Sequence, residues 1–214
     1  MKSFDIETFA SRCVEAMAAA DNPQEAAAAL LAETLSENDL QDIIRTLDAA
    51  IPKGADIGEM IVHRSPTLTM LYARVPPRFQ SGIHDHTVFA CIGQLSGEER
   101  NILFEPAADG EGLTVESTAK VRPGEVLRLP ADAVHCIENP GHTVASALHL
   151  YGGDFAALMD DRSLWSTTDH QRQSFSFPAL LRESALRMRE DNNEAGLNAI
   201  VEAIPATKAM VDNL

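Results

Sequence analysis

The sequence predicts a mainly β protein, an all-β sandwich or barrel with α-helices at both ends. Short apolar runs separated by turn signals occupy the middle of the chain, and apolar residues recur at helical spacing before and after it. The chain has 214 residues, a length that suits one domain. We therefore expect a single domain with N-terminal helices over 1–55, a β-barrel over 56–156 and a C-terminal helical extension over 157–214.

The first fifty residues predict three helices. The first has Ile6, Phe9, Cys13 and Met17 at helical spacing. Asn22 and Pro23 offer a cap and a first-turn proline for an alanine-rich helix that runs to about Glu33. Ser36 with Asp39 resembles a capping box before a third apolar stripe, which consists of Leu40, Ile43, Ile44 and Leu47.

The β region begins at about Glu59, and helical spacing returns after Asp154. Pro178 can open one late helix, and Pro205 ends the apolar stripe of the next. The turn signals between the predicted strands are Ser65-Pro66-Thr67, Pro76-Pro77, Ser96-Gly97, Ala108-Asp109-Gly110, Pro123-Gly124, Asn139-Pro140-Gly141 and Gly152-Gly153.

The charge and the cysteines exclude several classes of function. Acidic residues outnumber basic ones 32 to 17, a charge of −15 that repels nucleic acid and anionic lipid. Three cysteines without a close-spaced pair form neither a disulfide framework nor a zinc ribbon. The acidic N-terminus has no apolar signal region, and no run is long enough to span a membrane. We expect a cytoplasmic protein with no nucleic-acid or membrane partner.

His84 and His86 flank Asp85 within a predicted strand. Residues i and i+2 share a face of a strand, so both imidazoles can point into a barrel while Asp85 points away. Two neutral imidazoles form half of a site for iron, zinc, nickel or manganese. The alternative for such a pair is a solvated strand face.

The motif Gly-x5-Pro-x4-His-x3-Asn follows, and it consists of Gly124, Pro130, His135 and Asn139. Together with His84 and His86, it resembles the two motifs of the cupin superfamily over roughly residues 60–155. The resemblance implies a double-stranded β-helix, a jelly-roll barrel. It also implies a metal held by His84, His86 and His135, unless the barrel has lost its metal. Two departures are the absence of a glutamate after His86 and the presence of Asp132 where glycine is usual.

A three-histidine pattern is similar to the cysteine dioxygenase (thiol dioxygenase) branch of the cupins. The likeness rests on Ile83 to Thr87 with Cys91 five residues after His86, on Val134 to Asn139, and on Leu148-His149-Leu150-Tyr151. It implies Fe(2+), with Ni or Zn as alternatives, and a thiol oxidised by O2 to a sulfinate. It also implies catalytic roles for Tyr151, His149 and Cys91, with a thioether bond between Tyr151 and Cys91 as an option. The alternatives are a rim tyrosine and a small buried cysteine.

One departure separates the chain from the best-known members of that branch. The family often has a serine two residues before the histidine that corresponds to His149, where this chain has Ala147 and the neighbouring Ser146 faces the other way. The chain also resembles a bacterial branch of predicted metal-dependent double-stranded β-helix proteins, on Val62 to Pro66 and Leu150 to Asp154.

Arginine binds a carboxylate through a planar fork, so a thiol carboxylate substrate requires one near the metal. Arg64 is the first choice, because a hairpin closed at Pro66-Thr67 places it opposite Thr69. Arg78, in the loop that leads to His84, is the second choice and Arg74 the third.

The sequence thus favours an iron(II)-dependent dioxygenase that oxidises a small thiol carboxylate of the cysteine or 3-mercaptopropionate type. A metal-dependent cupin lyase or isomerase is one alternative, and a non-catalytic metal-binding sensor is the other. The expected partners are the thiol and O2, and the chain is expected to be a monomer or a homodimer.

Overall fold

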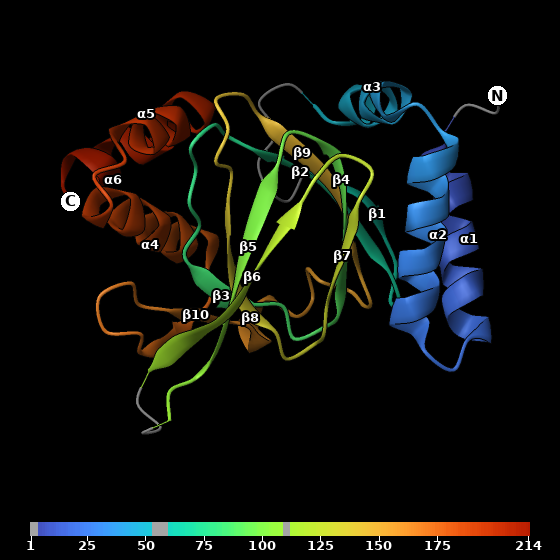
Figure 1. Ribbon diagram of the computed structural model, residues 1–214, viewed down its shortest axis with the longest axis horizontal. Coiled ribbons are helices and arrows are strands. Elements are labelled where there is room, and N and C mark those ends of the chain that lie inside the picture. The colour runs from blue at the N-terminus through green and yellow to red at the C-terminus, as the bar shows by residue number, and fades with distance from the viewer. Residues whose placement is uncertain (1–3, 53–59, 109–111) are drawn as a thin grey trace.

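A computed structural model describes residues 4–52, 60–108 and 112–214 of the chain. The predicted boundary between residues 55 and 56, the start of the β region at Glu59 and the centre of the turn at Asp109-Gly110 lie outside these residues. Within them, two antiparallel sheets face each other, with N-terminal helices on one side and C-terminal helices on the other (Figure 1). This architecture confirms the predicted mainly β fold with flanking helices.

The strand order of the sheets brings distant segments together. In spatial order, the five-stranded sheet contains β1 (Ile61–Arg64), β2 (Thr69–Val75), β9 (Ala145–Tyr151), β4 (Ala90–Ser96) and β7 (Val126–Leu129). The six-stranded sheet contains β11 (Arg172–Ser174), β10 (Ser163–Trp165), β3 (Ile83–Asp85), β8 (Val134–Glu138), β5 (Glu99–Pro106) and β6 (Leu113–Val121).

Alternation along the strands separates the barrel interior from the surface under the N-terminal helices. On β9, Ala147 and Tyr151 pack inside the barrel with Ile92 of β4. Leu148 and Leu150 point the other way, into the core shared with the helices. Since successive side chains lie on opposite faces of a strand, this register decides which residues can reach an interior site.

The three N-terminal helices are α1 (Ile6–Ala19), α2 (Pro23–Glu37) and α3 (Leu40–Ala50). Asn22 caps α2 as predicted, accepting a hydrogen bond from the Glu25 amide. The predicted capping box is wrong at Ser36, because α2 continues through it to Glu37 and Asp39 alone caps α3.

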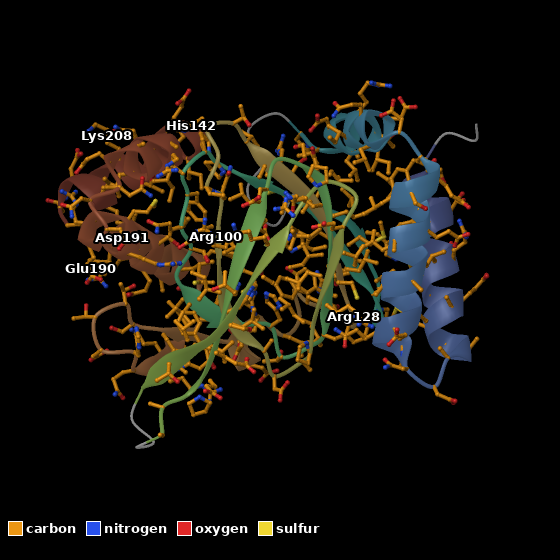
Figure 2. The ribbon with its side chains drawn as sticks, viewed as in Figure 1. Arg100, Arg128, His142, Glu190, Asp191 and Lys208 are labelled. Atoms are coloured by element: carbon orange, nitrogen blue, oxygen red, sulfur yellow. The ribbon has the colours of Figure 1, made fainter. Side chains whose placement is uncertain are left out.

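Helix α2 covers the outer face of β4. A side chain at Gly93 would meet Leu31 of α2 at 2.9 Å, so glycine allows the helix to approach the strand closely. At the margin of this contact Arg128 of β7 pairs with Glu25 of α2 at 2.9 Å (Figure 2).

The C-terminal extension is helical only in its second part. Between residues 157 and 176 the chain forms a short 3₁₀ turn, η1 (Met159–Asp161), and the strands β10 and β11. The prediction of a helical extension over 157–214 is therefore wrong for this first part. Pro178 lies in the first turn of α4, as predicted. The remaining elements are α4 (Phe177–Glu190), α5 (Glu194–Ala203), η2 (Pro205–Thr207) and α6 (Lys208–Asp212). Among the described helices, none is long and apolar enough to cross a membrane.

Candidate metal centre

Two neighbouring strands of the six-stranded sheet, β3 and β8, bring His84, His86 and His135 together in the barrel interior. His84 of β3 lies directly opposite His135 of β8 in the antiparallel pair, and His86 follows β3. One ligand nitrogen from each ring lies within 4.8 Å of the others, and all three side chains are buried. The arrangement is therefore a candidate site for one metal ion.

Hydrogen bonds on the far side of two rings fit them for a metal. His84 Nδ1 lies 3.1 Å from the Gly82 carbonyl oxygen, and His135 Nδ1 lies 2.9 Å from Asn101 Oδ1. Both partners are acceptors, so each Nδ1 carries the proton and each Nε2 keeps a lone pair. The Nε2 atoms of His135 and His86 lie only 3.2 Å apart, so both can bind one metal ion when His86 carries its proton on Nδ1.

Burial keeps these imidazoles neutral, the form that binds metal. Desolvation, aided by the nearby Arg162 cation, lowers the pKa of His84 to about 3. Desolvation and the neighbouring histidines lower the pKa of His86 and His135 well below the usual range.

Tyr151 and His149 lie beside the three histidines. The Tyr151 ring meets the His86 ring edge-on at a centroid distance of 5.1 Å and stacks on Phe155 at 3.9 Å. His149 Nδ1 lies 3.1 Å from the Tyr151 hydroxyl oxygen. Burial raises the pKa of Tyr151, so its phenol stays protonated and can donate a hydrogen bond. Both predicted residues therefore face the candidate metal site.

The other nitrogen of His149, Nε2, is buried and has no hydrogen-bond partner within the described part of the chain. The residue two positions earlier on the same face is Ala147, which offers no hydroxyl. Ser146 points away from the interior and shares a hydrogen bond of 2.7 Å with Ser96, as the alternation of the strand predicts.

Arg162, which the sequence analysis missed, is a buried cation next to this cluster. Its side chain is 3% exposed, and its guanidinium lies over the rings of Phe155 and Phe175 at 4.2 and 3.7 Å. Its Nε donates to the Asp85 carbonyl oxygen at 3.0 Å. Among the described residues no carboxylate oxygen lies within salt-bridge distance, and burial lowers the pKa of Arg162 to about 10. A buried guanidinium of this kind favours an anionic ligand.

The structure contradicts a catalytic role for Cys91. Cys91 pairs with Leu150 on the face that packs against the N-terminal helices, and its thiol lies 3.6 Å from the Gln24 carbonyl oxygen. Tyr151 lies on the opposite face of the same sheet. The Tyr151–Cys91 thioether bond is therefore excluded by strand alternation, and Cys91 is a buried core residue.

Arg64 also has another role. The predicted register is correct, since Arg64 lies opposite Thr69. Its side chain, however, is 51% exposed at the end of the edge strand β1, where Nε and one terminal nitrogen bond Asp154 at 2.7 and 3.0 Å. This bidentate pair satisfies the fork that a substrate carboxylate would use, so the position is corrected from substrate binding to a rim salt bridge.

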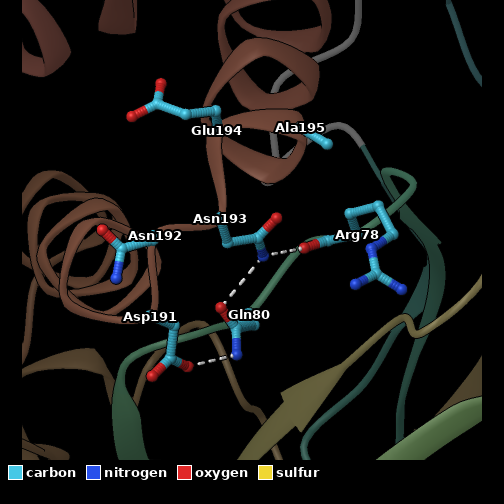
Figure 3. A pocket seen from close by; sticks show the side chains of 7 residues that line it. All are labelled: Arg78, Gln80, Asp191, Asn192, Asn193, Glu194 and Ala195. Atoms are coloured by element: carbon cyan, nitrogen blue, oxygen red, sulfur yellow. Dashed lines mark hydrogen bonds between the residues drawn. The ribbon is translucent and has the colours of Figure 1, made fainter.

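Arg78 is one of the residues that line an open hollow between the barrel and α5 (Figure 3). The hollow has a volume of about 370 Å³. It donates to the Pro140 carbonyl oxygen at 2.7 Å, and its exposed side chain lies outside the barrel. Gln80 at the centre of this hollow bonds both Asp191 and Asn193, so its polar groups satisfy one another. Arg74 lies on the outer face against Tyr72 and Asp48. His142 is exposed in a loop, as expected (Figure 2).

The missed residues had weak local signals. Arg162 stands in Asp160-Asp161-Arg162, which has the polar composition of a surface turn. The run Ser163-Leu164-Trp165 after it is apolar and could have indicated a short strand. Glu99 and Asn101, which also face the interior, stand in a charged run, Glu98-Glu99-Arg100-Asn101.

Comparison by sequence finds no matching protein-family model and no matching curated protein. Solved structures that resemble the chain include DMSP lyase DddQ from Ruegeria pomeroyi DSS-3, with 20% identity over 42% of this chain and 40% of that one and a TM-score of 0.34. A protein with a double-stranded beta-helix domain from Klebsiella pneumoniae has 13% identity over 50% of this chain and 82% of that one, with a TM-score of 0.40. A cupin superfamily protein from Desulfitobacterium hafniense DCB-2 has 17% identity over 44% and 75%, with a TM-score of 0.36.

The aligned part is thus less than half the length of DddQ. What this chain itself presents is a mainly β barrel whose interior brings three buried histidines, a tyrosine–histidine pair and a buried arginine together.

Proposed function

We propose that this protein is an iron(II)-dependent dioxygenase that oxidises the thiol of a small thiol carboxylate to a sulfinate. The observation that carries the proposal is the combination of a three-histidine cluster, a buried phenol and a buried arginine that has no carboxylate partner among the described residues. Three neutral imidazoles leave the full charge of a divalent ion available to an anionic thiolate. Iron(II), when bound, supplies the redox chemistry that a thiolate and O2 lack by themselves.

Arg162 suits the carboxylate of such a substrate. Arg162 lies close enough to His84, His86 and His135 for its positive charge to contribute to the lowered pKa of each. Phe155 and Phe175 pack on its guanidinium and restrict its rotation. A substrate with a carboxylate two or three bonds from its sulfur would therefore place the anion at Arg162 and the sulfur near the histidines.

Tyr151 suits the other reactant, O2, because its hydroxyl can donate a hydrogen bond inside the site. When His149 carries its proton on Nδ1 and donates it to the phenol oxygen, the Tyr151 proton is free to point into the site. A donor fixed in a buried site stabilises the negative charge that develops on oxygen while O2 is reduced. Phe155 stacks on the Tyr151 ring and holds it in place.

The net change requires no further reductant. The S–H bond of the thiol and the O–O bond break, and two S–O bonds form on the sulfur. Sulfur loses four electrons and O2 gains them, so both oxygen atoms end in the sulfinate. The thiol proton ends on the product or in solvent.

The test is O2 uptake by protein loaded anaerobically with Fe(II), with sulfinate detected by mass spectrometry. A thiol carboxylate should support uptake, and a thiol alcohol of the same length should support it poorly. Arg162→Gln should raise KM for the thiol carboxylate and leave the thiol alcohol unaffected. Arg64→Gln and Arg78→Gln are matched controls that should behave as wild type.

No uptake with any thiol would contradict the proposal and favour the lyase, isomerase or sensor alternatives. Equal effects of Arg162→Gln on both kinds of thiol would contradict the role given to Arg162. Metal content and circular dichroism of each variant verify that the site and the fold are intact.

A further inference from the structure

A series of hydrogen bonds runs from the candidate metal centre into the barrel wall through His135, Asn101 and Glu99. Glu99 and Asn101 are two residues apart on β5, so both side chains face the interior. His135 lies opposite Leu103 and Ile137 lies opposite Asn101, which makes Asn101 a diagonal neighbour of His135. Asn101 Oδ1 accepts the His135 Nδ1 proton at 2.9 Å, and Asn101 Nδ2 donates to Glu99 Oε1 at 2.9 Å.

When Glu99 is ionised, each atom of this hydrogen-bonded series has only one consistent role. The carboxylate oxygen can then only accept from Asn101 Nδ2, so the amide oxygen faces His135. That oxygen can only accept in turn, which fixes the proton on His135 Nδ1 and directs the Nε2 lone pair to the other histidines. Glu99 therefore determines, through one amide, which nitrogen of His135 is available to a metal.

Glu99 lacks, among the described residues, the ion pair that two other buried acids have; Asp85 has no ion pair either, but its carboxylate accepts a hydrogen bond from the Ser163 amide. Glu138 is paired with Arg100 and Arg187, and Glu183 is paired with Arg182. Glu99 is 0% exposed, has no salt-bridge partner among the described residues, and its Oε2 has no hydrogen-bond partner there either. Burial accordingly raises the pKa of Glu99 to about 7, and the bond from Asn101 offsets this only partly.

An unpaired carboxylate inside a barrel is costly unless a positive charge lies near it. The three imidazoles are neutral and would leave a divalent ion without an anion among its ligands. The ion and Glu99 can therefore compensate each other. The metal ion supplies the positive charge that the Glu99 carboxylate lacks, and Glu99 supplies the negative charge that the three imidazole ligands lack.

We propose that Glu99 and Asn101 form a carboxylate–amide chain that positions His135 and balances the charge of a divalent transition-metal ion held by the three histidines. The two residues act on the metal without touching it. The inference rests on the metal site that the proposed function requires, and it does not depend on a thiol substrate.

The experiment measures the affinity for Co2+ by competition with a coloured chelator, with no thiol present. Glu99→Gln and Asn101→Ala should each weaken binding by about 10–100-fold, the usual effect of removing a group that orients a ligand. Because the two residues act in series, the double variant should lose no more Co2+ affinity than the single variant that binds Co2+ more weakly. Gln94→Leu is the control, since Gln94 is another buried amide of the barrel wall and forms no hydrogen bond with Glu99, Asn101 or His135.

A second measurement separates this role from a structural one. Glu99→Gln keeps the shape and removes a costly charge, so the metal-free variant should melt at the wild-type temperature or above it at pH 8. Unchanged Co2+ affinity in either single variant would overturn the proposal. Loss in Glu99→Gln alone would mean that Glu99 ligates the metal directly, and additive losses would mean that the residues act independently. Failure of wild type to bind Co2+ would contradict the metal site itself, whereas failure of thiol oxidation would leave these results intact.

Discussion

At the scale of single residues, the site is built from buried polar groups whose outward partners are fixed and whose inward atoms are left open. His84 and His135 are held through Nδ1 by oxygen acceptors, and Tyr151 is held by His149 and Phe155. Groups held in this way lose little conformational entropy when a ligand or metal arrives. Their contributions can therefore be tested by removing one atom or one ring at a time.

The ligand prediction concerns His84 and His135. His84→Ala or His135→Ala should remove most bound metal, because two imidazoles cannot replace three, and the barrel should remain folded. Elemental analysis of protein purified in parallel with wild type measures the metal per chain. One metal per chain in both variants would contradict the site.

The donor prediction concerns Tyr151. Tyr151→Phe should reduce thiol-dependent O2 uptake by about 10²–10³-fold, the usual effect of one preorganised donor, with metal content unchanged. Tyr72→Phe is the matched control, because Tyr72 is equally buried but packs under the N-terminal helices. Intact mass should also show no loss of two hydrogens, since Cys91 and Tyr151 lie on opposite faces of the sheet. Wild-type activity in Tyr151→Phe would remove the phenol from the mechanism.

At the scale of elements, the short strand β10 matters most for the site. It pairs with β3, so that Leu164 lies opposite His84 and Trp165 lies opposite Ile83. This pairing fixes the preceding residue, Arg162, beside the histidines, and the Ser163 amide donates to an Asp85 carboxylate oxygen at 2.7 Å. A segment far from the histidines in sequence thereby supplies the cation of the site.

The element prediction compares two leucines of equal burial. Leu164→Ala and Leu31→Ala remove side chains that are both 0% exposed, so each should lower the free energy of unfolding by about 2–5 kcal/mol in urea titrations. Only Leu164→Ala should also raise KM for a thiol carboxylate, because it loosens the strand that carries Arg162. Equal KM values in the two variants would show that β10 does not position Arg162.

At the scale of the whole molecule, pH acts through groups buried in the barrel. Burial lowers the pKa of His149 to about 4, below its ordinary value of 6.5, so the unfolded chain binds this proton more readily than the folded one. Its contribution to stability is therefore present above pH 6.5 and is lost as the pH falls toward 4. Glu99 has the opposite sign, because its pKa is raised from 4.5 to about 7 and its contribution is lost as the pH rises through 7.

On acidification from pH 7.5 to 5, His149 should cost metal-free protein about 2 kcal/mol of stability, and Glu99 should return a similar amount. The net change is a loss, because the pKa of His84 is also lowered, to about 3, and protonation of this residue opposes folding in the same way as that of His149. Urea unfolding at pH 7.5 and 5 measures the difference. His149→Phe should make this difference smaller, and Glu99→Gln should make it larger, because it removes the opposing term. A difference that is the same in all three proteins would contradict these assignments.

The local features of the fold could be predicted from the sequence. The period of two along strands placed His84 and His86 on one face, and the resemblance of the motif around His135 to that of the cupins implied the third histidine of the site. Helical periodicity with its caps located the main helices at both ends, except that Ser36 lies inside a helix and that β10 and β11 precede α4 in the C-terminal extension. These features depend on neighbours within a few residues, which the chain order supplies directly.

The charged and polar residues that surround the histidines could not be predicted from the sequence and were found in the folded structure. Arg162 and Glu99 stand in polar stretches that are typical of surface turns, and they are buried because β10 joins β3 and β5 joins β8. Arg64 had the predicted register, yet its guanidinium forms a salt bridge with Asp154 at the rim of the barrel. Cys91 had the predicted spacing, yet the helices cover its face of the sheet. In each case the physical reason is a pairing between residues tens of positions apart, which local periodicity does not encode.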